Sequence, residues 1–199
     1  MRQIEAVLVS VLLSLLAGPA SAQWQKQVTP YDENRLLHLE ESRAEGLRQA
    51  ERGGAKKDLD AIHQVLDPQG RPISAHELMG TWRCRQMKLG GLAPSIVYDW
   101  FTCRVRETRS GLYFEKVSGT ERISGYVEAF DGGRLLLMGA LTVKTERPKP
   151  FSGGNFGVGA PTTSSDAVGI ISATGPGRAR IEFPYPTIES DFDVMELRR

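Results

Sequence analysis

From about residue 79 onward, apolar and polar residues alternate in short segments separated by glycine-containing turns. A period of two is typical of strands with one buried face, and regularly spaced turns favour an antiparallel meander. We expect strands near residues 80–89, 96–107, 112–117, 120–130, 134–144, 167–174, 178–185 and 193–198. About eight strands with a common inner face predict a mainly β fold, a small antiparallel β-barrel or rolled sheet, with a β-sandwich as the alternative.

A helical pattern precedes these strands. Thr29-Pro30 followed by two acidic residues is typical of a helix start, and apolar residues then recur at helical spacing as far as Gly53-Gly54. A second helix is expected over residues 58–66. Residues 135–141 are apolar at nearly every position, so this strand needs cover on both faces. We therefore expect residues 23–78 to form a helical segment that packs on a β domain spanning residues 79–199.

The first 22 residues have the features of an export signal. An uncharged apolar run, residues 6–17, is followed by Gly18-Pro19 and by the small residues Ala20-Ser21-Ala22. The run is too short to span a bilayer, and no comparable run follows it. We expect cleavage near Ala22, a periplasmic or secreted mature chain, and no transmembrane anchor in that chain.

Cys84 and Cys103 are the only two cysteines, and an even count in an exported chain predicts a disulfide. Two buried free thiols are the alternative. If the two cysteines face each other across a hairpin, three further pairs follow: Trp82 with Val105, Gln86 with Phe101, and Lys88 with Asp99. If the alternation continues through the following hairpins, a series of apolar side chains lies on the same inner face as the cysteines: Leu112, Phe114, Ile123, Val127, Leu136 and Met138.

Composition and motifs exclude several classes of function. The net charge is +1, whereas a general nucleic-acid binder needs a basic excess. The sequence contains no nucleophile elbow, phosphate-binding loop or dinucleotide fingerprint. The three histidines, His38, His63 and His76, have no zinc-site spacing. We therefore expect no catalytic residues, no cofactor and no metal site.

Three groups of residues are candidates for binding. The hairpin register places Arg83, Arg85, Arg104 and Arg106 on the outer face, as an anion or partner site or as members of salt bridges with Glu115. The Gly-, Pro- and Ser-rich segment 145–166 contains Phe151 and Phe156 and predicts either a lid loop over a barrel mouth or a disordered excursion. Glu189, Asp191 and Asp193 alternate before the last strand, as a cation or acid/base site or as a solvated edge.

Four blocks of the sequence resemble a known family. They are residues 80–90, 98–104, 175–178 and 189–197. These blocks are similar to an uncharacterised family of exported bacterial proteins, domain of unknown function 4893. The resemblance implies a bacterial, periplasmic protein and assigns no catalytic residue. Separately, Gly80-Thr81-Trp82 resembles the Gly-x-Trp start of lipocalin-like barrels, which implies a barrel that holds a ligand.

Taken together, these features predict a non-enzymatic binding module for a small ligand or a cell-envelope component. One alternative is an envelope protein-interaction or inhibitor module that uses the arginine-bearing face. The other is a hydrolase that uses Glu189, Asp191 or Asp193.

Overall fold

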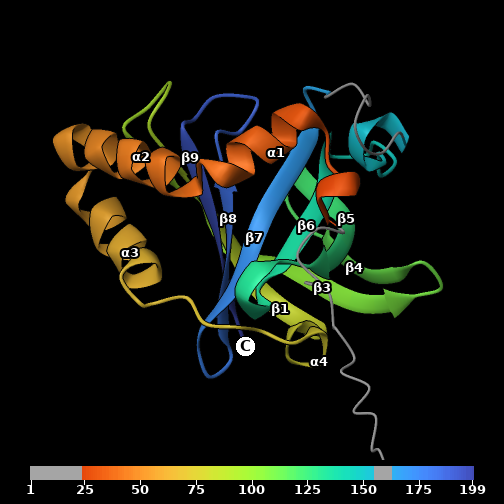
Figure 1. Ribbon diagram of the computed structural model, residues 1–199. Coiled ribbons are helices and arrows are strands. Elements are labelled where there is room, and N and C mark those ends of the chain that lie inside the picture. Colours follow the sequence, from red (N-terminus) through yellow and green to blue (C-terminus); the bar gives the residue numbers. More distant parts are fainter. Residues whose placement is uncertain (1–23, 155–162) are drawn as a thin grey trace, which may run out of the picture.

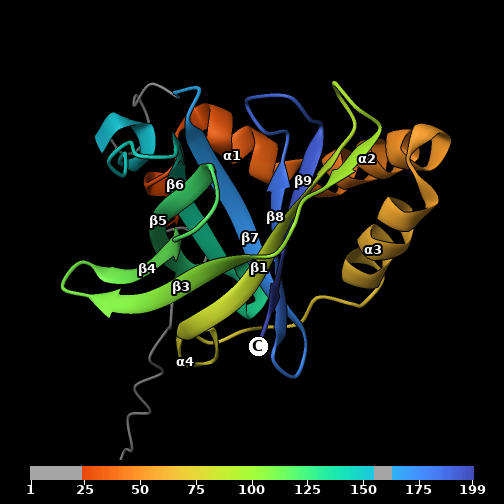
Figure 2. The ribbon, with the colours of Figure 1, turned by 180° about the vertical axis from the view of Figure 1, so that it is seen from behind.

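The computed structural model describes residues 24–154 and 163–199, and the expected export signal and Phe156 lie outside these residues. One antiparallel sheet runs in the order β2-β1-β3-β4-β5-β6-β7-β8-β9, and β1 also pairs with β9. This second pairing closes eight of the strands into a barrel and leaves β2 as an extra strand on β1 (Figure 1, Figure 2). The predicted mainly β barrel fold is confirmed. The strands are β1 Gly80–Leu89, β2 Ser95–Val97, β3 Phe101–Thr108, β4 Gly111–Lys116, β5 Glu121–Ala129, β6 Leu135–Val143, β7 Asp166–Gly175, β8 Arg178–Pro184 and β9 Phe192–Arg198.

The helices precede the barrel in the chain. They are α1 Pro30–Leu37, α2 Leu39–Gly53, α3 Lys56–Leu66 and the short α4 Ala75–Leu78, with 3-10 turns η1 Trp24–Lys26, η2 Asp131–Gly133 and η3 Phe151–Gly154. As expected, Thr29 caps α1 by accepting a hydrogen bond from the backbone N–H of Asp32. The single helix expected from Pro30 to Gly53 is instead divided at His38, whose backbone leaves the helical region. The bend lets α1 contact β7 and β8 while α2 contacts β8, β9 and β1 (Figure 1).

Two apolar clusters lie on the two sides of the barrel wall. The inner cluster fills the barrel and includes Trp82, Phe114, Leu137, Ile181 and Met195. The outer cluster lies between the wall and the helices, where Leu36, Ile62 and Val65 meet side chains such as Phe192 and Val194. Burial of apolar surface on both sides of the wall is the main stabilising contribution to this arrangement.

The predicted hairpin register is wrong by two residues. Trp82 pairs with Cys103 and Cys84 pairs with Phe101, so the cysteines are diagonal neighbours. A shift of two residues keeps every side chain on the same face of the sheet. The disulfide between Cys84 and Cys103 is therefore present inside the barrel, with a Cα–Cα distance of 5.9 Å.

The register error comes from the assumption that the two cysteines lie directly opposite each other, and the hairpin also contains a bulge that was not predicted. Residues 98–100 lie opposite only Arg85 and Gln86, because Val97 pairs with Met87 and Phe101 pairs with Cys84. The one extra residue divides the strand expected over residues 96–107 into β2 and β3. Alternation of residue types does not reveal such an insertion.

The predicted orientation of β6 is also wrong. Leu136 and Met138 point to the outer cluster, and Leu137 points into the barrel. The strand is apolar on both faces, so alternation could not orient it. Which alternate residues of β6 point into the barrel depends on the length and shape of the connection 130–134. In this connection Gly132 adopts a positive φ of 64° and Phe130 donates its N–H to the carbonyl of Arg134. The other predicted inner residues, Leu112, Phe114, Ile123 and Val127, are confirmed.

Candidate functional site

Among the described residues, side chains fill the barrel interior and leave no room for a ligand. Side chains of the inner cluster occupy its centre, and a cavity of about 30 Å³ remains at the end near Gln86 and Asp193. That volume is close to the space one water molecule occupies in the liquid. The ligand-holding interior implied by the Gly-x-Trp start is therefore wrong.

A polar cluster occupies this end of the barrel. The Nε2 group of Gln86 donates to Oδ2 of Asp193 at 3.0 Å, and Ser190 Oγ donates to Oδ1 of the same carboxyl at 2.6 Å. Gln86 Oε1 is buried without a hydrogen-bond partner among the described residues. Burial raises the pKa of Asp193 to about 7, although the bonds from Ser190 and Gln86 and the charge of Lys88 oppose this rise.

Lys88 lies beside this cluster and joins it to the barrel rim. Its Nζ donates to Glu189 at 2.7 Å and lies 3.6 Å from Glu121. Burial disfavours the charged ammonium, but the bond to Glu189 and the charges of Glu121 and Asp193 outweigh burial and raise the pKa of Lys88. Lys88 therefore stays charged and pairs with the exposed rim carboxylates.

Replacing Asp193 with asparagine is expected to change how stability depends on pH. With a pKa of about 7 when folded, Asp193 keeps a proton that the unfolded chain, with a pKa near 3.8, has released. The wild type therefore loses stability as the pH rises between these two values, and the asparagine variant lacks this contribution. Between pH 5 and pH 8 the variant should gain about 2–3 kcal/mol relative to the wild type. Urea unfolding of both proteins at the two pH values measures this difference, and an equal difference at both values contradicts it.

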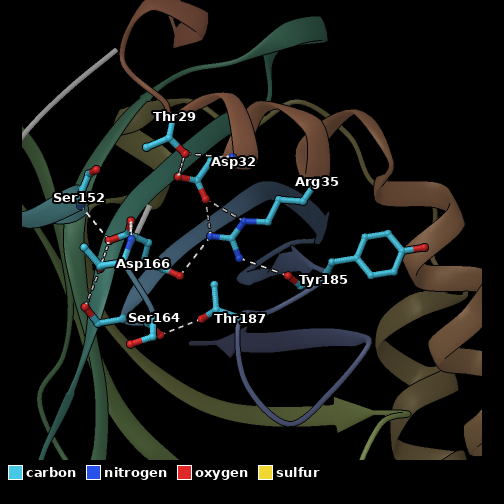
Figure 3. A network of polar contacts seen from close by, with 10 residues as sticks. Thr29, Asp32, Arg35, Ser152, Ser164, Asp166, Tyr185 and Thr187 are labelled. Carbon is cyan, nitrogen blue, oxygen red and sulfur yellow. Dashed lines mark hydrogen bonds and ion pairs between the residues drawn. The ribbon is translucent and has the colours of Figure 1, made fainter. Parts of the chain in front are cut away.

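A second buried network fastens α1 to the barrel (Figure 3). The guanidinium of Arg35 binds Asp32 Oδ1 through Nε at 2.9 Å and Nη2 at 2.6 Å, and it donates to the backbone carbonyls of Asp166 and Tyr185 at 3.1 and 3.3 Å. Thr29 Oγ1 donates to the other oxygen of Asp32 at 2.6 Å. The network joins α1, the start of β7 and the loop before β9, and this set of mutual contacts fits a structural role.

The four arginines predicted as one site lie in two groups. Arg85 binds Glu196 at 2.7 Å, and Arg83 and Arg85 both lie against the ring of Trp100. Arg106 lies 3.5 Å and Arg104 lies 4.0 Å from Glu115, the salt-bridge partner that the sequence suggested. The register predicted from the sequence would also place Arg83 opposite Arg104, which is wrong, because Arg83 lies opposite Thr102.

The three carboxylates before β9 do not converge. Glu189 binds Lys88, Asp191 accepts a bond from Gln49 Nε2 at 2.7 Å, and Asp193 points into the barrel. Within residues 24–154 and 163–199, no group of three or more His, Cys, Asp or Glu side chains is placed to hold a metal ion.

A groove of about 570 Å³ lies on the outer face of β4, β5 and β6. Its floor is a row of three neighbouring residues, Tyr113, Tyr126 and Met138, which pair across these strands. The two tyrosine rings meet edge to face with centroids 5.1 Å apart. The rest of the lining comes from Gln27 of the N-terminal segment, from Ser110, Gly125 and Glu128, and from the segment Pro148, Lys149, Pro150 and Phe151.

The position of Phe151 defines one wall of this groove. Its side chain is 4% exposed and belongs to the outer cluster with Met138. The neighbouring Ser152 N–H donates to Asp166 Oδ1 at 2.8 Å, which fastens this part of the segment to β7. Phe151 therefore lies on the outside of the barrel wall. The lid over the barrel mouth stays a prediction, because Phe156 lies outside the described residues.

The sequence analysis did not identify the groove, although two outward-facing tyrosines indicated an apolar patch there. Tyr113 and Tyr126 occupy outward positions of adjacent strands, where a soluble sheet usually carries polar residues. Trp100 was missed for another reason, since it lies in the bulge that the alternation concealed.

A family model described as "Domain of unknown function (DUF4893)" matches residues 24–197 and confirms the resemblance seen in the sequence. No curated protein and no solved structure matches the chain. Among the described residues, the helices are all too short or too polar to cross a membrane.

Proposed function

We propose that this chain, which belongs to the DUF4893 family, is an exported, non-enzymatic binding module that holds a small, largely apolar ligand in the groove outside its barrel. The observation that carries the proposal is the groove of about 570 Å³ with a floor of Tyr113, Tyr126 and Met138. Ligand sites of small molecules are typically concave, mostly apolar and about 300–1,000 Å³ in volume. The expected export signal supports a bacterial periplasmic or secreted location.

The lining of the groove supports a ligand with a largely apolar body. Aromatic rings, the Met138 thioether and two prolines offer apolar and polarisable surface, which suits a flat or branched hydrocarbon body. Gln27, Glu128 and Lys149 add polar groups at the groove, which can orient a ligand that carries one polar end. Because side chains fill the barrel interior, the proposed ligand binds outside the barrel wall, unlike in a lipocalin-like carrier.

Replacing Tyr126 with alanine is expected to weaken binding of a neutral apolar fluorophore, N-phenylnaphthylamine, by about tenfold. The tyrosine is 36% exposed, so its removal takes contact surface from the groove and leaves the inner cluster intact. One aromatic contact with the ligand contributes about 1.5 kcal/mol to binding, and its loss raises Kd about tenfold. Fluorescence titration of the purified protein measures the change in Kd.

A matched control is Leu37→Ser, which removes an exposed apolar side chain at the end of α1, 66% exposed, away from the groove. It should leave Kd within about twofold, a difference of roughly 0.4 kcal/mol. Equal Kd values for the wild type and Tyr126→Ala, with both proteins folded by circular dichroism, would overturn the proposal.

The hydrolase alternative has less support. Its three carboxylates bind three different partners, and Asp193 is only 7% exposed inside the barrel end, so a substrate does not reach it.

A further inference from the structure

Three arginines lie side by side on the outer face at one end of the barrel. Arg198 of β9 is paired directly with Arg83 of β1 on one side and with Arg178 of β8 on the other. Like charges placed directly opposite each other on a sheet are destabilising. A row of this kind therefore reduces the stability of the free protein.

The row is only partly neutralised. Glu196, the neighbouring residue on the same face of β9, binds both Arg85 and Arg198. In the described part of the chain, no carboxylate lies within salt-bridge distance of Arg83 or Arg178, both of which are exposed. Two cations of the row thus remain available for an anionic group from outside the chain.

Trp100 lies against two arginines of the row, Arg83 and Arg198, and against Arg85. Its ring lies 4.9, 4.7 and 5.2 Å from the guanidinium carbons of Arg83, Arg85 and Arg198. Stacking on an aromatic ring uses the flat face of a guanidinium and leaves its N–H edge free for bidentate binding of a carboxylate. Ordering by the ring also lowers the entropy that Arg83 and Arg198 lose when they bind a partner.

We propose that Arg83, Trp100, Arg178 and Arg198, here called the arginine–tryptophan surface, dock an acidic segment of a protein partner. The site is a second one, independent of the groove, because it lies on β1, β8 and β9 and the groove lies on β4, β5 and β6. The observations favour a protein over a polyanionic glycan for two reasons. Tryptophan and arginine together are the residues most enriched at the energetic centres of protein interfaces. A net charge of +1 also gives the chain little general attraction for polyanions, so the positive charge is local.

The experiment measures binding of poly-L-glutamate to the purified protein at low salt, with Arg83→Gln/Arg178→Gln as the test variant. The matched control is Arg48→Gln/Arg52→Gln, which removes the same number of charges from α2. The test variant should bind at least about tenfold more weakly and show a shallower dependence of Kd on salt, because two charge-assisted contacts are lost. The control should stay within about twofold of the wild type, equivalent to roughly 0.4 kcal/mol.

Two further measurements keep the result interpretable. The test variant should unfold at the same or a higher temperature than the wild type, since the substitutions remove like-charge repulsion, so weaker binding is not a consequence of unfolding. A Trp100→Ala variant, with unchanged net charge, should also lose affinity if the ring orders the arginines. Equal affinity of the test and control variants overturns the proposal. Tighter, Arg83- and Arg178-dependent binding of heparin than of poly-L-glutamate overturns the protein partner in favour of a glycan.

Discussion

Replacing Arg35 with alanine should lower the free energy of unfolding by about 3–5 kcal/mol, the cost typical of removing one partner from a buried ion pair. Arg35 is 3% and Asp32 is 0% exposed, so the variant leaves a carboxylate with no access to water and without its cation. The carbonyls of Asp166 and Tyr185 lose a donor in the same step. Urea unfolding of the variant and the wild type measures the difference.

Arg48→Ala is the matched control. Arg48 also pairs with an acidic residue three positions away on a helix, Glu45, but it is 51% exposed. Exposed pairs contribute about 0–1 kcal/mol, so this variant should be nearly as stable as the wild type. If both alanine variants lose the same small amount of stability, the Arg35 network does not fasten α1 to the barrel.

Removing the disulfide is expected to cost about 3 kcal/mol. The bond between Cys84 and Cys103 spans a sequence separation of 19 residues and restricts the unfolded chain more than the folded barrel. Both cysteines are fully buried in the inner cluster, so the Cys84→Ala/Cys103→Ala variant loses some packing as well. The closed loop contains β2 and Trp100, and its loss should therefore also loosen the arginine–tryptophan surface.

Unfolding with and without reductant separates the two contributions. Reductant should lower the stability of the wild type and leave the double alanine variant unchanged. A wild type that unfolds at the same urea concentration after both thiols have been alkylated would show that the cross-link does not stabilise the fold.

The sequence predicted most of the barrel because period two is a local property. Strand ends follow from turn residues such as Ser110-Gly111, and the inner face follows from residues such as Phe114 and Ile123 that alternate with polar neighbours. The N-cap of α1 could be predicted for the same reason, since Thr29 and Asp32 are three residues apart in the chain. The cysteine pair was predicted from the even cysteine count, and the register error did not affect it, because diagonal and directly opposed residues point to the same face.

Prediction failed where the information was not local. The cysteine count did not show whether the two cysteines are directly opposed or diagonal, and the alternation did not show the bulge at residues 98–100. In β6, which is apolar on both faces, the sequence did not show whether Leu136 or Leu137 points into the barrel. The groove and the arginine row were not predicted because they too depend on residues that are distant in the sequence. Tyr113, Tyr126 and Met138 form a groove floor only when three strands are placed side by side, and Arg83 meets Arg198 only when the barrel closes.

The sequence by itself determined that the chain forms a disulfide-linked antiparallel barrel with helices before it, because hydrophobic period, turn chemistry and cysteine count act over a few neighbouring residues. Only the tertiary structure decided that the interior is full, that the groove lies outside the wall, and that arginines of β1, β8 and β9 form one row. Those features depend on which strands become neighbours and on how side chains from distant segments share one volume. The pairing of β1 with β9, which closes the barrel, determines which strands are neighbours and which side chains share the interior.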